Sequence, residues 1–257
     1  MPTIHPTAVV ASGAVLAPST VVGPFVTIED GVEVGAETEL LTGTILLQGS
    51  RIGARCKLGP YAVIGGEPMD SAFRGEESCA VLEEGVEARE FATIHRATGE
   101  GSETCVGRNT LLMSYTHVSH NVRVGPGTTL ATSVQLGGHV QVGAHAFLGA
   151  NALTHQFVRI GDHAMLAGGS AALQDILPYC LAAKTPALHF GLNRVGLRRR
   201  GFKGERYTLL ERAVRALRSN DQTRFEALAA TSNDVAAIQR FRENSERGIA
   251  RFVVQRL

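Results

Sequence analysis

The stretch Leu112-Met-Ser-Tyr-Thr-His-Val-Ser-His-Asn-Val-Arg-Val124 decides the fold, because an aliphatic residue recurs in it at every sixth position. The same spacing continues on both sides, at Val106, Leu112, Val118, Val124, Leu130, Leu136, Val142 and Leu148. A period of six is neither the 3.6 residues of an α-helix nor the 2.0 of a flat strand. It is typical of a hexapeptide β-helix, in which three hexads make one coil of about 18 residues. We therefore predict a mainly β protein built as a parallel β-helix.

An N-terminal block has the same spacing and predicts further coils. Its aliphatic positions are Ile4, Val10, Leu16, Val22, Ile28, Val34, Leu40, Leu46, Ile52, Leu58 and Ile64. Glycine often follows the aliphatic residue, at Gly23, Gly35, Gly53, Gly59 and Gly65. Because glycine has no Cβ, we expect it to turn the corners of the coil.

Two polar insertions interrupt the repeat, near residues 66–78 and 97–104. Polar loops inserted in a strict solenoid tend to lie on one face and carry binding, although a tolerated surface insertion is the alternative. The repeat ends near Ala172, and Pro178 follows it. We expect a β-helix over residues 1–178 and a C-terminal helical domain over residues 179–257.

The C-terminal part loses the sixfold spacing and becomes rich in Arg, Leu, Ala and Glu, which predicts amphipathic helices. The expected helices cover residues 188–200, 204–217, 223–230, 234–242 and 245–254. The segments Ser219-Asn-Asp and Thr231-Ser-Asn-Asp predict connections with N-caps. The end of a solenoid needs protection against edge pairing, and we expect these helices to cap it.

Charge is distributed unevenly along the 257 residues, whose formal net charge is +1. Residues 178–257 hold 16 Lys and Arg against 7 Asp and Glu, a net of +9. The remainder holds 9 against 17, a net of −8. The basic part favours an acidic partner or a phosphate-bearing ligand, although arginines that only solvate helices would give the same count.

Several classes of protein are disfavoured by composition. The four cysteines, Cys56, Cys79, Cys105 and Cys180, form no CxxC motif and no dense framework, which favours a reducing compartment. The N-terminus has no signal-peptide pattern, and no apolar run approaches the roughly 20 residues of a membrane span. We expect a soluble, cytoplasmic protein with no transmembrane segment and no nucleic-acid partner.

Histidines gather in the second block, at His117, His120, His139, His145, His155 and His163. Positions separated by three hexads should stack on successive coils. This places His145 beneath His163, Asn121 beneath His139, and His120 beneath Gly138.

Three chemistries fit this cluster. In the first, neutral His120 takes a proton from a substrate hydroxyl while the Gly138 N–H holds a developing oxyanion. In the second, His117, His120 and His139 bind Zn²⁺ and leave a position for water, as in a hydratase. In the third, the histidines are structural, with His145 and His163 forming an exposed ladder.

The chain resembles the acyl-(acyl carrier protein)–UDP-N-acetylglucosamine O-acyltransferases, which begin lipid A synthesis. The resemblance covers essentially the whole length. It is carried by IHPTAVV (4–10), TIHRAT (93–98), NTLLMSYTHVSHNVRVG (109–125), LGGHVQVG (136–143), THQFVRIGDHAMLAGGS (154–170), QDILPY (174–179) and GLNRVGLRRRGF (191–202). It implies a left-handed β-helix with a C-terminal helical region, assembled as a homotrimer with sites between subunits.

The resemblance also implies the reaction: transfer of an (R)-3-hydroxyacyl group from acyl carrier protein to the 3-hydroxyl of UDP-N-acetylglucosamine, with no covalent intermediate and no cofactor or metal. His120 matches the general base and Gly138 the oxyanion donor. The positions that match sugar-nucleotide or acyl contacts are Asp70, His117, His139, His155 and Gln156. Asn193 and Arg199 match positions near the uridine and phosphates, with Arg200 beside them, and Gly168 matches the position that limits acyl length.

Three positions depart from the family pattern. Asn121 stands where the family usually has aspartate, and Ala72 where it commonly has lysine. Ala183-Lys184-Thr185-Pro186 stands where relatives usually show Gly-Asn. These departures leave open an acyltransferase with a 3-amino sugar acceptor or another donor, and a degenerate paralogue that binds without turnover.

Overall fold

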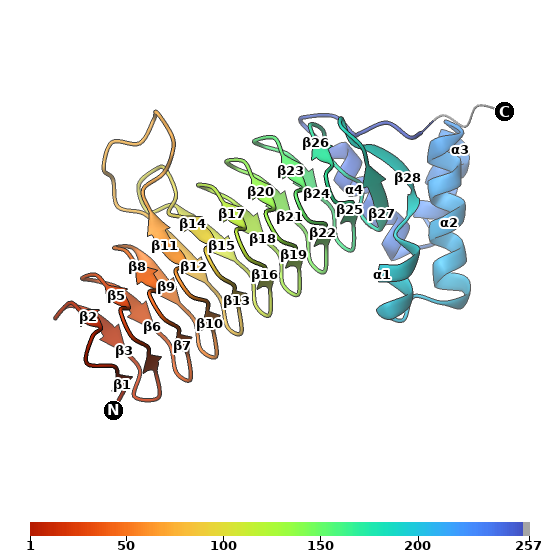
Figure 1. Cartoon of the computed structure of the whole chain (residues 1–257). Helices are drawn as coiled ribbons and strands as arrows, with labels where there is room; N and C mark the ends of the chain where they lie inside the picture. Colours follow the sequence, from red (N-terminus) through yellow and green to blue (C-terminus); the bar gives the residue numbers. More distant parts are fainter. Residues whose placement is uncertain (254–257) are drawn as a thin grey trace.

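The computed structural model describes residues 1–253 and shows a three-sided β-helix with helices at its C-terminal end (Figure 1). Short strands form three sheets, called A, B and C, which the chain visits in that order. All strand pairs are parallel except the final one, β27 with β28. None of the described helices has the length and apolar character that crossing a membrane demands.

The three sheets extend along the whole β-helix. Sheet A contains β1 (Thr3–Ile4), β4 (Val21–Val22), β7 (Glu39–Leu40), β10 (Lys57–Leu58), β13 (Glu87–Ala88), β16 (Leu111–Leu112), β19 (Thr129–Leu130), β22 (Phe147–Leu148), β25 (Met165–Leu166), β27 (Cys180–Ala183) and β28 (Leu188–Leu192). Sheet B contains β2 (Val9–Val10), β5 (Thr27–Ile28), β8 (Ile45–Leu46), β11 (Val63–Gly66), β14 (Thr93–His95), β17 (His117–Val118), β20 (Gln135–Leu136), β23 (Leu153–Thr154) and β26 (Ala171–Ala172). Sheet C contains β3 (Val15–Leu16), β6 (Glu33–Val34), β9 (Ser50–Ile52), β12 (Cys79–Leu82), β15 (Glu103–Val106), β18 (Arg123–Val124), β21 (Gln141–Val142) and β24 (Arg159–Ile160).

The register confirms the predicted coil length. Thr129 pairs with Phe147, which lies three hexads further along the chain. The two insertions lengthen single coils, because Lys57 pairs with Glu87, and Glu87 in turn pairs with Leu111. Each of these two pairs spans more of the sequence than three hexads do. The predicted aliphatic residues from Val22 onward form one continuous buried core along the axis. Val10 and Leu16 pack against it and are partly buried, whereas Ile4 in the first coil is exposed.

The role predicted for glycine at the corners is wrong for most of them. The left-handed backbone conformation falls two residues later, on residues such as Phe25 (φ 59°), Glu37 (φ 58°) and Tyr61 (φ 57°). The glycine itself is needed for close approach: a Cβ on Gly35 would lie 2.6 Å from the backbone of the next coil. Of the five glycines, Gly65 alone has a positive φ, 87°.

The C-terminal helices are α1 (Arg194–Arg199), α2 (Gly204–Arg218), α3 (Gln222–Ala229) and α4 (Asn233–Glu243). They pack around a second apolar cluster that includes Leu210 and Phe225. The predicted N-caps are confirmed, because the side chains of Asp221 and Ser232 accept hydrogen bonds from the first turns of α3 and α4.

Two helix predictions need correction. Residues 188–192 form strand β28, which pairs with β27, so only 194–199 of the segment 188–200 is helical. The segment predicted as a helix over 245–254 is not helical in its described part, which bends at 246–247 and then pairs with the end of the β-helix. Ala250 N–H donates to the Asp175 carbonyl at 3.0 Å, and His189 N–H to the Arg251 carbonyl at 2.8 Å. Position 254 lies outside the described residues. The open edge at the end of the solenoid outweighs helical propensity here, because its unpaired backbone groups require partners.

Candidate active site

Three edges run along the β-helix where one sheet passes into the next, and we call them the A–B, B–C and C–A edges. Both insertions leave from the B–C edge, since 67–78 joins β11 to β12 and 96–102 joins β14 to β15. Figure 1 shows these loops projecting together from one side of the β-helix. His120 and Gly138 lie on corners of the same edge, after β17 and β20. The fold therefore brings the predicted binding loops and the predicted base together.

His120 is nearly buried at this edge, with 7% of the residue exposed. Its Nδ1 atom lies 2.9 Å from Oδ1 of Asn121. On its other side, a Cβ on Gly138 would lie 2.5 Å from Nε2. Because an amide oxygen only accepts hydrogen bonds, Nδ1 carries the proton and Nε2 presents a lone pair. The predicted stacking of His120 beneath Gly138 is confirmed.

Asn121 is fixed by the second inserted loop. Its Nδ2 donates to the Thr98 carbonyl at 2.9 Å, and its Oδ1 accepts from the Thr98 N–H at 3.0 Å. Its own N–H donates to Oγ1 of Thr104 at 2.8 Å. These bonds determine which amide atom faces His120, so the loop controls the tautomer of the imidazole.

Asp70, on the first inserted loop, supplies the negative charge that Asn121 lacks. Its Oδ2 lies 3.8 Å from Nδ1 of His120. Its Oδ1 accepts from the Ala72 N–H at 3.0 Å. That bond, with contributions from Thr98, His120 and His139, lowers the pKa of the Asp70 carboxyl, which is therefore ionised at neutral pH.

The Gly138 N–H occupies a corner position that attracts anions elsewhere in the fold. This position recurs every sixth residue, and on three other corners its N–H donates to a carboxylate: Gln48 to Glu29 at 2.8 Å, Arg108 to Glu83 at 2.9 Å and Ala144 to Asp162 at 2.7 Å. Within residues 1–253 the Gly138 N–H has no such acceptor. It is free to bind an oxyanion beside Nε2 of His120.

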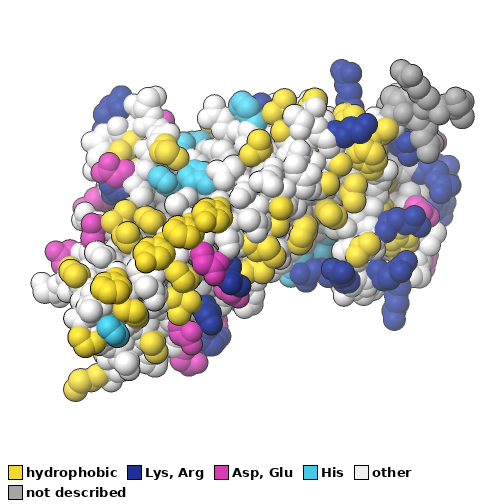
Figure 2. Space-filling view, in the orientation of Figure 1, with side chains coloured by type: hydrophobic (Ala, Val, Ile, Leu, Met, Phe, Trp, Pro, Cys, Tyr) yellow, Lys and Arg dark blue, Asp and Glu magenta, His cyan; other side chains and the backbone are white. Residues whose placement is uncertain are grey.

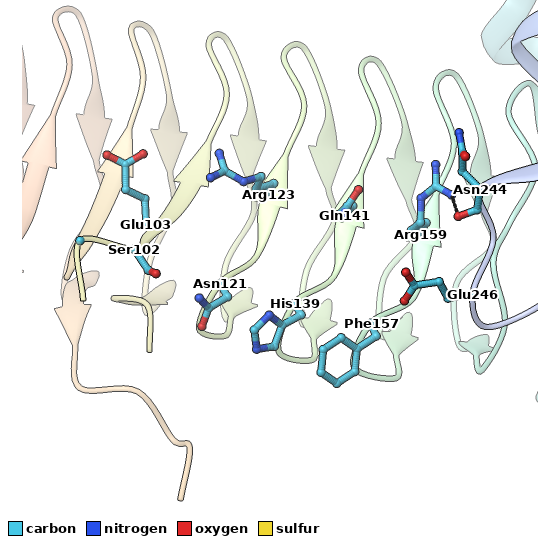
Figure 3. Close-up of a pocket in the computed structure, with 11 residues that line it drawn as sticks. Ser102, Glu103, Asn121, Arg123, His139, Gln141, Phe157, Arg159, Asn244 and Glu246 are labelled. Atoms are coloured by element: carbon cyan, nitrogen blue, oxygen red, sulfur yellow. Dashed lines mark hydrogen bonds between the residues drawn. The ribbon is translucent and has the colours of Figure 1, made fainter. Parts of the chain in front are cut away.

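A groove of about 760 Å³ opens next to this corner, along the face of sheet C (Figure 3). Asn121, His139 and Phe157 follow one another along one side, while Arg123, Gln141 and Arg159 project from the sheet. The His139 ring stacks on Phe157 with centroids 4.6 Å apart and meets His120 edge-on at 5.3 Å. Burial and nearby His120 lower the pKa of His139 against the opposing effect of Asp70, so a neutral ring borders the groove.

Other predicted contact residues lie nearby on sheet B and its corners. Nδ1 of His117 lies 2.8 Å from Oγ1 of Thr93. Burial, together with neighbouring His95, lowers the pKa of His117 to about 4. His155 and Gln156 are exposed one coil beyond Gly138, and Nδ1 of His155 lies 3.1 Å from the Gln156 carbonyl.

The residues predicted to bind the nucleotide, and the one predicted to limit acyl length, lie on other edges of the chain. Arg200 donates to the Gly127 carbonyl at the C–A edge (3.3 Å), and Arg199 is exposed at the end of α1. Asn193 is buried as the N-cap of α1 and also donates to the His163 carbonyl at 3.0 Å, so its amide is already used structurally. Gly168 is exposed at the A–B edge, after β25.

Two contacts at the site were absent from the sequence prediction. Thr98, which holds Asn121, lies within an insertion that has no repeat register to align it. Phe157, which stacks on His139, lies one coil after it, so the coil period would have identified it. The expected His145–His163 ladder exists with centroids 5.2 Å apart, but it is half-buried and continues into Tyr179 and Phe202.

The zinc set expected as an alternative does not form in the described chain. The three side chains whose donor atoms all lie within 4.8 Å of one another are Asp70, His120 and His139. His117 faces His95 instead, with ring centroids 5.1 Å apart.

Comparisons with known proteins identify relatives of this chain. Residues 175–250 match the family model described as UDP N-acetylglucosamine O-acyltransferase, domain 2. An acyl-(acyl-carrier-protein)–UDP-N-acetylglucosamine O-acyltransferase of Paraburkholderia phymatum is 38% identical over 98% of this chain and 100% of its own. The UDP-N-acetylglucosamine acyltransferase structure from Francisella novicida superposes with a TM-score of 0.93 at 31% identity, covering 97% of this chain and 94% of the other.

The corresponding structure from Bacteroides fragilis gives a TM-score of 0.91 at 36% identity, covering 97% of this chain and 100% of the other. These similarities confirm the expected left-handed β-helix and the enzyme class. The chain belongs to the UDP-N-acetylglucosamine O-acyltransferase family.

Proposed function

We propose that the chain transfers an (R)-3-hydroxyacyl group from acyl carrier protein to the 3-hydroxyl of UDP-N-acetylglucosamine, the first step of lipid A biosynthesis. The names of its relatives support this acceptor and this donor. The observation that carries the mechanism is the position of Nε2 of His120, which would lie 2.5 Å from a Cβ on Gly138, a residue whose N–H has no acceptor within residues 1–253.

His120 acts as the general base. Its Nε2 accepts the hydroxyl proton while the sugar oxygen attacks the thioester carbonyl, and the carbonyl oxygen becomes an oxyanion bound by the Gly138 N–H. When the intermediate collapses, the carbon–sulfur bond breaks and the thiolate recovers the proton from the imidazolium. General-base catalysis contributes typically 10²–10⁴-fold, and an oxyanion donor on the order of 3–4 kcal/mol.

In this chain Asp70 stabilises the positive charge of the imidazolium. The neutral amide of Asn121 orients the ring but cannot balance its charge. The ionised Asp70, 3.8 Å from Nδ1, provides that balance. A 3-amino sugar acceptor is the second candidate, favoured by Asn121 and Ala72, since an amine is a better nucleophile and needs less help from a base.

A complete site requires more than one copy of the chain. Arg199 and Arg200 lie away from the B–C edge, while Lys and Arg side chains gather over the C-terminal end of the molecule (Figure 2). A homotrimer in which the C–A edge of one copy faces the B–C edge of the next unites arginines for the diphosphate with the base. Gly168, at the A–B edge, is proposed to set the acyl length, because the absence of a side chain there leaves room for a longer chain.

Mass spectrometry of products tests the proposal, with a panel of acyl carrier proteins and both sugar nucleotides. We expect an O-linked 3-hydroxyacyl product, and a rate at least about 100-fold lower for His120→Ala. His5→Ala, which removes an exposed imidazole far from the site, is the control. Product from the amino sugar alone would establish the second candidate, and transfer that survives His120→Ala would exclude His120 as the base.

Mixed trimers test the shared site. His120→Ala is expected to turn over slowly and Arg199→Glu to bind the sugar nucleotide weakly. At subsaturating sugar nucleotide, co-expressed chains should transfer faster than either variant alone, because some interfaces receive both intact residues. An active monomer in analytical ultracentrifugation would contradict the trimer.

A further inference from the structure

We propose that Asp70, His120 and His139 form an inhibitory site for a transition-metal ion such as Zn²⁺. The three side chains come from the first inserted loop and from two successive corners of the B–C edge. Their donor atoms lie within 4.8 Å of one another, and Oδ2 of Asp70 is 3.8 Å from Nδ1 of His120. The metal site rests on these contacts alone, and only its inhibitory effect rests on the proposed function.

The donor set suits zinc and its neighbours. Two imidazoles and one carboxylate are ligands that Zn²⁺, Co²⁺ and Ni²⁺ accept, whereas Mg²⁺ and Ca²⁺ require an oxygen shell. Tetrahedral metal–ligand distances of 2.0–2.2 Å put donor atoms about 3.3 Å apart. The observed separations need a small closure, which Asp70 can supply because it lies half-buried on a loop. Three protein ligands leave a fourth tetrahedral position for water.

Metal binding would remove the base without removing the side chain. An ion on Nδ1 of His120 occupies the position that now carries the proton, so the proton of the neutral ring resides on Nε2. Nε2 then donates toward Gly138 and cannot accept a proton from the acceptor hydroxyl. The ion also takes up the Asp70 carboxylate, so the base and its counter-charge are lost together.

Co²⁺ titration followed by visible absorption tests the site on the full-length protein. We expect one Co²⁺ per chain with intense d–d bands, displaced by Zn²⁺. Asp70→Asn and His139→Asn should each weaken binding at least about tenfold, since even outer-shell substitutions cost 10–100-fold in metal affinity.

His145→Asn is the matched control. His145 also has a left-handed backbone (φ 59°, as for His139) and also pairs with a second histidine, but at the C–A edge. Unchanged binding in Asp70→Asn and His139→Asn, or loss in His145→Asn instead, would overturn the proposal. Binding at the predicted residues without slower acyl transfer would refute inhibition and count against His120 as the base, while the metal site itself would stand.

Discussion

The Nδ1 atom of His120 lies 2.9 Å from Oδ1 of Asn121, and Asn121 is held in turn by two hydrogen bonds to the backbone of Thr98. The imidazole is therefore oriented by a neutral group that is anchored to an inserted loop. Charge and orientation, which a single aspartate would supply together, come from two residues: Asn121 on the coil corner, and Asp70 on the first inserted loop, 3.8 Å from the same nitrogen.

Replacing Asn121 with aspartate should shift the pH dependence of transfer. A carboxylate at 2.9 Å favours the imidazolium, so the acid limb of the kcat profile should move to higher pH by about one unit. The same carboxylate would face the Thr98 carbonyl, which now accepts from Nδ2, and we expect a stability loss of about 1–3 kcal/mol.

The measurements are pH–rate profiles and thermal unfolding. Asn151→Asp is the control, because Asn151 also has a left-handed backbone (φ 57°) but is exposed at the A–B edge. A profile that superposes on the wild type would mean that Asn121 does not set the state of His120.

Alanine at Gly138 should impair catalysis more than folding. Its Cβ would lie 2.5 Å from Nε2 of His120, so the ring must move away from the position proposed for proton acceptance. We expect kcat to fall at least about tenfold, with a stability loss in the range of about 1–3 kcal/mol typical of overpacking. Steady-state kinetics and calorimetric binding of the sugar nucleotide separate the two effects. Equal losses in kcat and in nucleotide affinity would argue that the substitution disturbs the whole corner.

The sequence predicted the β-helix well because every coil repeats the same packing requirement. An inward aliphatic residue at every sixth position leaves a single register, so the stacking of His120 beneath Gly138 followed from arithmetic on the coil. The anchoring of Asn121 by Thr98 could not be foreseen, because the loop 96–102 adds residues outside that register. Asp70, on the other loop, was assigned to the substrate contacts through resemblance to relatives and not through periodicity, and its position beside His120 was not predicted.

The C-terminal end of the β-helix was predicted less well, because its conformation also depends on contacts outside the repeat. Both 188–192 and 245–253 carry helix-compatible patterns, but the first forms a strand and the second is not helical. Their conformation is set by the open edge of the last coil, whose unpaired backbone groups need partners. A local sequence pattern carries no information about this tertiary pairing.

Reversing the charge of Arg199 should weaken sugar-nucleotide binding. Arg199 is exposed at the end of α1, so a glutamate there costs little folding free energy but repels a diphosphate. We expect the dissociation constant to rise about tenfold, corresponding to about 1.4 kcal/mol, and less at high salt. Arg212→Glu makes the same charge change on the exposed face of α2 and is the control in calorimetric titration. An affinity loss of equal size in both variants would indicate a general field effect and no specific phosphate contact.

Acid should destabilise the C-terminal cap, which comprises β28, the helices and residues 245–253, through protonation of His189. Its Nε2 accepts from the Leu177 N–H at 2.9 Å, and its Nδ1 donates to the Ala250 carbonyl at 2.8 Å, so the neutral ring joins the last coil, β28 and the tail. Burial lowers the pKa of His189 to about 4. In the unfolded chain a histidine has a pKa near 6.5, so the unfolded state takes up the proton first as pH falls. The contribution is complete above pH of about 6.5 and is lost progressively toward pH of about 4, amounting to about 3 kcal/mol.

Thermal unfolding from pH 7.5 to pH 4.5 checks this expectation. His189→Gln should be less stable than the wild type at pH 7.5, because the Leu177 N–H and the Ala250 carbonyl lose well-placed partners. The difference should shrink toward pH 4.5, because glutamine does not titrate. Burial also lowers the pKa values of His117 and His163 to about 4. The stability of the His189→Gln variant therefore still decreases in acid because of these two residues. A gap between wild type and His189→Gln that stays constant with pH would show that protonation of His189 does not govern the acid stability of the cap, whereas His5→Gln should follow the wild type throughout.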